Sequence, residues 1–121
     1  MFLTIVAGVA VCIGGFAAAL PRLLLDSKGV APNAATNVWV REVGVLLVAL
    51  GVTAFLVRGQ ADSATLRAFL IGNVIVQLGL LPIEVLAYAR GVITKLSGIV
   101  PNTVLHVVLA AGFAFYALAM S

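Results

Sequence analysis

The feature that most constrains this chain is its division into four apolar blocks separated by short polar or Gly/Pro-containing breaks. A helix needs about 20 apolar residues to cross the roughly 30 Å hydrocarbon core of a bilayer, and each block is close to that length. Apolar residues make up 64% of the 121 residues and charged residues 9%, which is outside the usual range of soluble globular proteins. The sequence therefore predicts an all-α integral membrane protein, a single up-down four-helix bundle over residues 1–121.

The apolar blocks set the expected helix bounds. We expect helices at residues 2–24, 37–57, 64–90 and 101–120, with Asp62 or Ser63 as the N-cap of the third. The first block lacks a basic segment before it and is longer than the core of a signal peptide, so it is expected to be a true span. Pro101 is expected in the first turn of the fourth helix, where a missing N–H costs nothing.

The distribution of positive charge predicts the orientation, because Lys and Arg near span ends are retained in the cytoplasm. Two of the basic residues, Arg58 and Arg67, belong to the side that also holds both termini. The opposite side, with the first and third loops, carries the other five: Arg22, Lys28, Arg41, Arg90 and Lys95. Both termini are therefore expected on the outer side, and a bacterial inner (plasma) membrane is the expected location.

Polar side chains recur on one face of the third apolar block, in the stretch NVIVQLGLLPIEVLAYAR at residues 73–90. At about 100° per residue, Asn73, Gln77 and Glu84 fall within roughly 40° of one another. Pro82 lies between Gln77 and Glu84 and removes a hydrogen bond to the Leu78 carbonyl, which favours a kink there. The block thus combines an apolar surface with one polar stripe.

Three ionisable groups are expected to share one depth at the inner face of the bundle. Glu42, Glu84 and His106 each lie about 7–9 Å from the expected end of their helix. A charge facing acyl chains costs about 3 kcal/mol even on mild insertion scales, so both carboxylates are expected to face the bundle interior. Arg41 is expected to pair with Glu84 from a neighbouring helix, which leaves one carboxylate ionised beside it while the other holds a proton.

This arrangement predicts acid-base chemistry in a polar pocket that opens to the cytoplasmic side. No cofactor is expected. Metal ligation by His106 and the two glutamates is the less favoured alternative, because no close spacing motif joins them. The candidate catalytic residues are Glu42, Glu84, Arg41 and His106. The candidate substrate- or water-binding residues are Asn73, Gln77, Trp39, Tyr88 and Phe113.

A purely structural interpretation stays open for each group. The charged residues can pin the helices together as an interfacial hydrogen-bond cluster, and Trp39 and Tyr88 can belong to an aromatic belt at the membrane surface. Small residues are expected to let helices approach closely. They are Gly44 with Gly51, Gly72 with Gly79, and the run from Gly14 to Ala19. The single cysteine, Cys12, excludes an intrachain disulfide and is expected to pack as a small core residue.

One stretch carries a family resemblance. VREVGVLLVALGVTAFLVRG, residues 40–59, opens with an Arg and continues through spaced glycines. In this it resembles the second helix of small four-helix DoxX-like membrane proteins. The resemblance implies a four-helix bundle; members of that family are functionally diverse, so it implies no particular activity.

The leading functional hypothesis is a membrane-embedded enzyme that acts on a lipophilic small molecule. Epoxide hydrolysis, or an isomerisation or cyclisation that shuttles protons, suits the side chains available. The alternatives are a small proton-coupled transporter and a non-catalytic membrane subunit. The expected partners are the substrate, membrane lipid and a second copy in a homodimer; no nucleic acid is expected.

Overall fold

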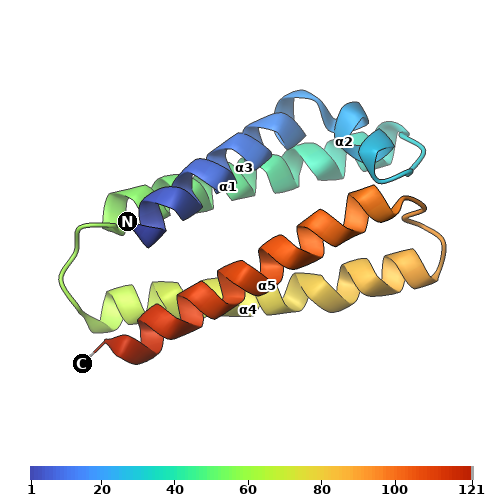
Figure 1. The fold of residues 1–121 in the computed structure, drawn as a ribbon. Helices are drawn as coiled ribbons and strands as arrows, with labels where there is room; N and C mark the ends of the chain where they lie inside the picture. Colours follow the sequence, from blue (N-terminus) through green and yellow to red (C-terminus); the bar gives the residue numbers. More distant parts are fainter. Residues whose placement is uncertain (121) are drawn as a thin grey trace. The chain divides into compact units, whose positions relative to one another are not determined.

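The computed structural model describes residues 1–120, and these form five α-helices and no β-strand (Figure 1). This confirms the all-α prediction. Four of the helices are long and apolar enough to cross a membrane: α1, α3, α4 and α5. The chain divides into two compact units, Met1–Gly59 and Gln60–Ser121. The helices are α1 (Phe2–Ala19), α2 (Pro21–Ser27), α3 (Ala34–Val57), α4 (Ala64–Ala89) and α5 (Leu96–Ala119).

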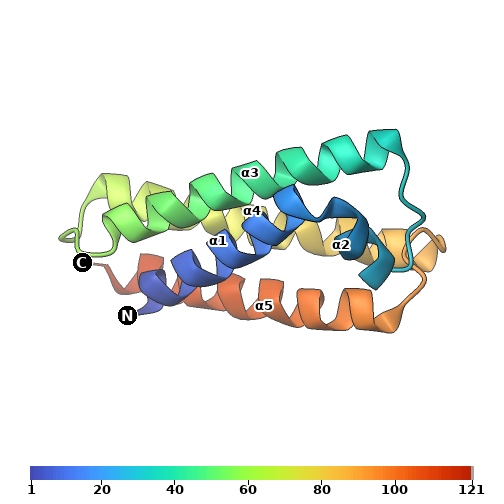
Figure 2. The ribbon, with the colours of Figure 1, turned by 90° about the horizontal axis from the view of Figure 1, so that it is seen from above.

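In the first unit, α1 and α3 run antiparallel and side by side (Figures 1 and 2). Their backbones come so close that a Cβ on Gly14 would lie 2.6 Å from the Gly44 carbonyl oxygen, and one on Gly44 would lie 2.5 Å from the Ala18 nitrogen. Gly51 approaches the Ala7 carbonyl in the same way, at 3.0 Å. The close approach predicted for Gly14, Gly44 and Gly51 is therefore confirmed.

The first expected helix, 2–24, is interrupted. It ends at Ala19, and Leu20 has φ −126° and ψ 54° before α2 begins at Pro21. The interruption follows from Pro21, which lacks an N–H and disfavours helical backbone in the residue before it. The helix α3 starts three residues earlier than expected because of a capping box, in which Asn33 Oδ1 accepts from the Thr36 N–H at 2.9 Å and Thr36 Oγ1 accepts from the Asn33 N–H at 2.9 Å.

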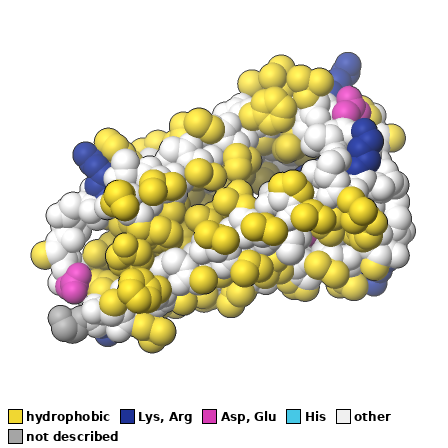
Figure 3. Space-filling model, in the orientation of Figure 1, with side chains coloured by type: hydrophobic (Ala, Val, Ile, Leu, Met, Phe, Trp, Pro, Cys, Tyr) yellow, Lys and Arg dark blue, Asp and Glu magenta, His cyan; other side chains and the backbone are white. Residues whose placement is uncertain are grey.

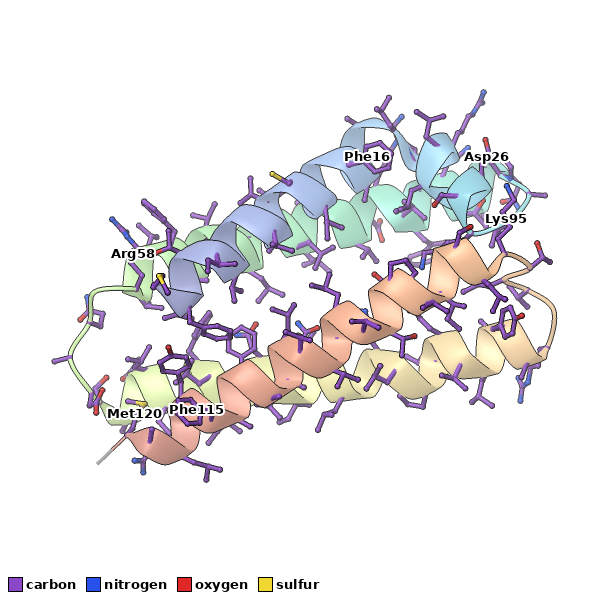
Figure 4. All side chains as sticks on the ribbon, in the orientation of Figure 1. Phe16, Asp26, Arg58, Lys95, Phe115 and Met120 are labelled. Carbon is purple, nitrogen blue, oxygen red and sulfur yellow. The ribbon has the colours of Figure 1, made fainter. Side chains whose placement is uncertain are left out.

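In the second unit, α4 and α5 form an antiparallel hairpin. The hairpin is anchored at the start of α4, where Ser63 Oγ accepts from the Leu66 N–H at 3.1 Å, which confirms the predicted cap. The Arg67 guanidinium donates to the carbonyl of Met120, just beyond the end of α5. Figure 4 labels Met120 and Phe115 at this end of the hairpin. A surface pocket lies here, between the start of α4 and the end of α5, and is lined in part by Asp62, Ser63, Arg67, Ile71 and Met120.

Three expectations about individual residues are wrong. The helix α5 begins at Leu96, so Pro101 lies in its second turn and leaves the Ser97 carbonyl without its helical donor. Gly72 and Gly79 have nothing within 4 Å of a built Cβ, so they are not close-packing positions within the hairpin. Cys12 is exposed on α1 and is not a core residue.

Large apolar side chains cover much of the surface. Leu56 and Ile75 are each 67% exposed, and Leu118 is 86% exposed. Figure 3 shows hydrophobic side chains spread along the helices in this view, with charged ones near the helix ends. Arg58 illustrates such an end: its guanidinium lies 3.5 Å from the centroid of the Phe55 ring, and its place is labelled in Figure 4.

Candidate functional site

A chain of hydrogen bonds connects α4 and α5 through four polar side chains. Asn102 Nδ2 lies 2.6 Å from Glu84 Oε1 and 3.1 Å from His106 Nε2. His106 Nδ1 in turn lies 2.6 Å from Gln77 Oε1. Glu84, Asn102, His106 and Gln77 are called the polar chain below.

Helix geometry places these residues on facing sides of the hairpin. Asn102 and His106 are four residues apart on α5, so they share a face. Gln77 and Glu84 are seven residues apart on α4 and also share one. The result is two cross-links between the helices, Asn102 to Glu84 and His106 to Gln77. The predicted stripe thus brings Gln77, Glu84 and His106 together.

The polar chain is buried at Gln77 and half-buried elsewhere. Gln77 is 7% exposed, while Glu84, Asn102 and His106 are half-buried. Buried polar groups are costly unless they are hydrogen-bonded, and here each of the four side chains has at least one partner in the chain.

The polar chain reaches deeper than the sequence predicts for His106. Because α5 begins at Leu96, His106 lies about 15 Å along the helix axis, where about 7 Å was expected. Gln77 lies about 18 Å from the end of α4 at Ala89, while Glu84 lies about 8 Å from it. Glu84 and His106 therefore do not share one depth, and the polar chain runs from near the helix ends to the middle of the hairpin.

Asn73 belongs to the stripe and is buried, with 6% exposed, but its amide turns back onto its own helix. Asn73 Nδ2 donates to the Phe69 carbonyl at 2.9 Å. Its predicted role in holding substrate or water remains a prediction.

Two prolines flank the outer cross-link. Pro82 lies two residues before Glu84, and Pro101 lies one residue before Asn102. Each removes one backbone donor and leaves a carbonyl four residues earlier without its helical partner, while both helices continue past the proline. The backbone that carries Glu84 and Asn102 thus lacks one hydrogen bond on each side of the hairpin.

The predicted partners on α3 belong to the other unit. Glu42 and Arg41 are both exposed, and Trp39 is 64% exposed. Glu42 lies about 200° around α3 from Gly44, the residue that meets α1, so it faces away from α1. The catalytic roles of Glu42 and Arg41, the contact between Arg41 and Glu84, and the role of Trp39 remain predictions.

The aromatic candidates differ in exposure. Phe113 is fully buried, with 0% exposed, two turns after His106 on the same face of α5. Tyr88 is 38% exposed, one turn after Glu84 on α4. Among residues 1–120, no three His, Cys, Asp or Glu side chains lie close enough together to hold a metal ion.

Sequence reasoning did not single out Asn102, although this residue joins Glu84 to His106. With the fourth helix expected to start at Pro101, Asn102 lay in the first turn of the expected helix. Its position four residues before His106 was the available signal, because that spacing places both on one face of a helix.

In comparisons with known proteins, no protein-family model, no curated protein and no solved structure matches this chain.

Proposed function

We propose that this chain is a membrane-embedded enzyme that acts on a lipophilic small molecule by acid-base chemistry at the polar chain. The observation that carries the proposal is the continuous hydrogen-bonded link from the Glu84 carboxyl group to the His106 imidazole within an apolar hairpin. Groups that bind and release protons are uncommon inside apolar helices and tend to be functional there. An apolar surrounding suits a substrate that partitions into lipid.

Glu84 is the proposed general base. Asn102 donates to its Oε1, which fixes the direction of the carboxyl group. In epoxide hydrolysis, Glu84 would take a proton from water as the water oxygen bonds to an epoxide carbon, and the released alkoxide would gain a proton from an acid. In an isomerisation, Glu84 would remove a proton from one substrate atom and an acid would return one to another atom.

The acid is assigned to one of two residues. His106 already belongs to the polar chain and is close to the middle of α5. Its neutral imidazole would give one proton to the alkoxide as its other ring nitrogen gains a proton from water. Glu42 is the acid predicted from sequence. Loss of activity in His106→Gln but not in Glu42→Gln would assign the acid to His106, and the converse result would assign it to Glu42.

The membrane topology is part of the proposal. Four helices that are long and apolar enough to cross a membrane support four spans, which we propose form an up-down bundle with both termini outside. The excess of Lys and Arg in and around residues 28–33 and 90–95 supports placing these loops in the cytoplasm. We also propose that the chain lies in a bacterial inner membrane, that its pocket opens to the cytoplasmic side and that it forms a homodimer.

A proton-coupled transporter is the second candidate. It is favoured by the extent of the polar chain, which runs from near the helix ends to mid-hairpin and so offers a route for a proton. An enzyme works in detergent, whereas a transporter needs a sealed vesicle. A non-catalytic subunit would be inert in both assays.

The test is turnover by the purified chain in detergent, with a terpene epoxide and styrene oxide as hydrolysis probes. Deuterium uptake from heavy water by lipophilic enones is the probe for isomerisation. Glu84→Gln is expected to lower kcat by about 10²- to 10⁴-fold, because it removes the base. Asp62→Asn, a carboxyl change in the loop before α4, is the matched control and should leave kcat unchanged. Full activity in a folded Glu84→Gln variant would refute acid-base catalysis by Glu84.

A further inference from the structure

The hydrogen bonds of the polar chain have a defined direction. An amide oxygen only accepts and an amide nitrogen only donates. His106 Nδ1 must therefore carry the hydrogen that Gln77 Oε1 accepts, and His106 Nε2 must accept from Asn102 Nδ2. Asn102 uses one amide hydrogen on His106 and the other on Glu84 Oε1. The arrangement thus requires a neutral imidazole with its proton on Nδ1 and a carboxyl oxygen of Glu84 that accepts.

We infer that Asn102 is a positioning residue that couples the protonation of Glu84 to the tautomer of His106. Through His106 it also determines whether Gln77 turns its amide oxygen or its amide N–H groups toward the imidazole. This inference deepens the proposed function and rests on it for its meaning in turnover. Its basis is the placement of one amide group within hydrogen-bond distance of both ionisable side chains of the hairpin interior.

A proton on Glu84 Oε1 reverses every bond in the polar chain. Glu84 then donates, so the Asn102 amide turns by about 180° and its Oδ1 accepts. The same oxygen accepts from His106 only if the imidazole proton is on Nε2. The imidazole releases its Nδ1 proton to water and gains one at Nε2 from water, so it carries one proton in both states. The net change is one proton added to Glu84.

The reversal ends at Gln77. With Glu84 ionised, Gln77 Oε1 faces the imidazole and its amide N–H groups point away from it. With Glu84 protonated, Gln77 Nε2 donates to His106 Nδ1 and the oxygen points away. Glu84 and Gln77 are seven residues apart, so the effect travels about 10 Å along α4.

This sequence of bonds defines a ligand class for the Gln77 end. The ionised state presents amide donors, which suit a neutral oxygen acceptor such as an epoxide, ether or carbonyl. The protonated state presents an amide oxygen, which suits a hydroxyl donor. When Glu84 takes a proton during turnover, the polar chain changes from favouring the acceptor substrate to favouring an alcohol product.

The single histidine of the chain makes the inference directly testable. Selective ¹⁵N labelling of histidine yields one imidazole, whose two nitrogen shifts distinguish the Nδ1–H tautomer, the Nε2–H tautomer and the imidazolium. Glu84 and Glu42 are the only glutamates, so ¹³C labelling of the glutamate carboxyl group in a Glu42→Gln background reports on Glu84 alone. Both signals are followed as pH falls, in the full-length chain in detergent.

The titratable neighbours are His106 on the facing helix, Tyr88 and Arg90 on the α4 side, and Lys95 directly before α5. We expect the Nδ1–H tautomer while Glu84 is ionised, and a change of about tenfold or more in the tautomer ratio as Glu84 gains its proton. Observation of the Nε2–H tautomer beside an ionised Glu84 would overturn the inference. A direct change of His106 from the Nδ1–H tautomer to the imidazolium as pH falls would overturn the inference too.

Asn102→Leu should uncouple the two signals, so that the tautomer ratio no longer follows Glu84. Thr103→Leu, the neighbouring polar residue outside the polar chain, is the matched control and should keep the coupling. Coupling that survives in Asn102→Leu would refute the role of Asn102. If Asn102→Leu does not fold, the inference is still tested in the wild-type chain, by whether the His106 tautomer changes as Glu84 gains its proton.

These results separate the inference from the proposed function, because the NMR signals need no turnover. A coupled tautomer in a protein without enzymatic activity would refute only the proposed function. Turnover without the tautomer change would refute only the role of Asn102.

Discussion

The contact between Gln77 and His106 shows what a single amide contributes inside an apolar hairpin. Gln77 has almost no exposed surface, and its oxygen accepts from the His106 imidazole at 2.6 Å. Because Gln77 is 7% exposed, its amide oxygen has little access to water as an alternative partner. Hydrogen bonds between membrane helices contribute about 0.6–2 kcal/mol each, and an unpaired buried donor costs about 1–3 kcal/mol.

Gln77→Leu is therefore expected to lower the free energy of unfolding by about 1–2 kcal/mol, because the imidazole N–H loses its acceptor. Chemical denaturation in detergent, followed by circular dichroism, measures this change. Gln60→Leu makes the same replacement at an exposed position and should stay within about 0.5 kcal/mol of the wild type. Equal stability of the two variants would show that the bond contributes nothing to folding.

The sequence indicated some residues of the polar chain and missed one. The phase of Gln77 and Glu84 on a helix follows from spacing alone, and the structure places both against α5 partners. Asn102 escaped notice because its importance depends on where α5 begins. That start, at Leu96, is hard to predict because residues 91–100 mix glycine with apolar residues.

The two hairpins are held together by different physical means. In α1 and α3, glycines allow the backbones to touch, which gains dispersion contacts over a short distance. In α4 and α5, side-chain hydrogen bonds cross the interface, while a Cβ on Gly72 or Gly79 would meet nothing within 4 Å. Glycine spacing of seven residues occurs in both units and therefore does not by itself identify a packing face.

Gly44→Ala is expected to destabilise the chain by about 1–3 kcal/mol, since the new methyl group would lie 2.5 Å from backbone atoms of α1 that cannot move aside. Gly72→Ala is the matched control: its Cβ meets open space, and alanine favours a helix by up to about 1 kcal/mol. Thermal unfolding in detergent compares the two. A Gly44→Ala variant as stable as Gly72→Ala would contradict the close approach of α1 and α3.

Helix ends illustrate which parts of an element the sequence predicts. Ser63 was identifiable because a serine stands directly before an apolar run. The interruption at Leu20 was missed, since the apolar run continues past Pro21 while the backbone does not. Pro21 coincides with a break that the apolar run does not reveal, whereas α4 and α5 continue past Pro82 and Pro101.

For the whole molecule, the charge distribution leads to a topology that can be measured. In a Cys12→Ser background, Ala31→Cys places a thiol in the loop before α3 and Ala61→Cys places one in the loop before α4. A membrane-impermeant maleimide applied to intact spheroplasts is expected to label Ala61→Cys but not Ala31→Cys, because positive charge holds the first loop inside. Labelling of Ala31→Cys alone would reverse the proposed orientation.

Permeabilised spheroplasts are the control, because both thiols should then react.

Composition sufficed to predict the all-α class and the four candidate spans, since apolar length alone determines whether a helix can cross a bilayer. The expected contact between Arg41 and Glu84 is of a different kind. It depends on tertiary packing between residues far apart in the chain, for which one sequence carries no periodic signal.

The hydrogen bond from the Arg67 guanidinium to the Met120 carbonyl connects the beginning of α4 to the carboxyl-terminal end of the described chain. An affinity tag or fluorescent fusion added at this end of the chain would follow closely after Met120, whose carbonyl accepts this bond. Expression work should therefore place such additions at the amino-terminal end of the chain.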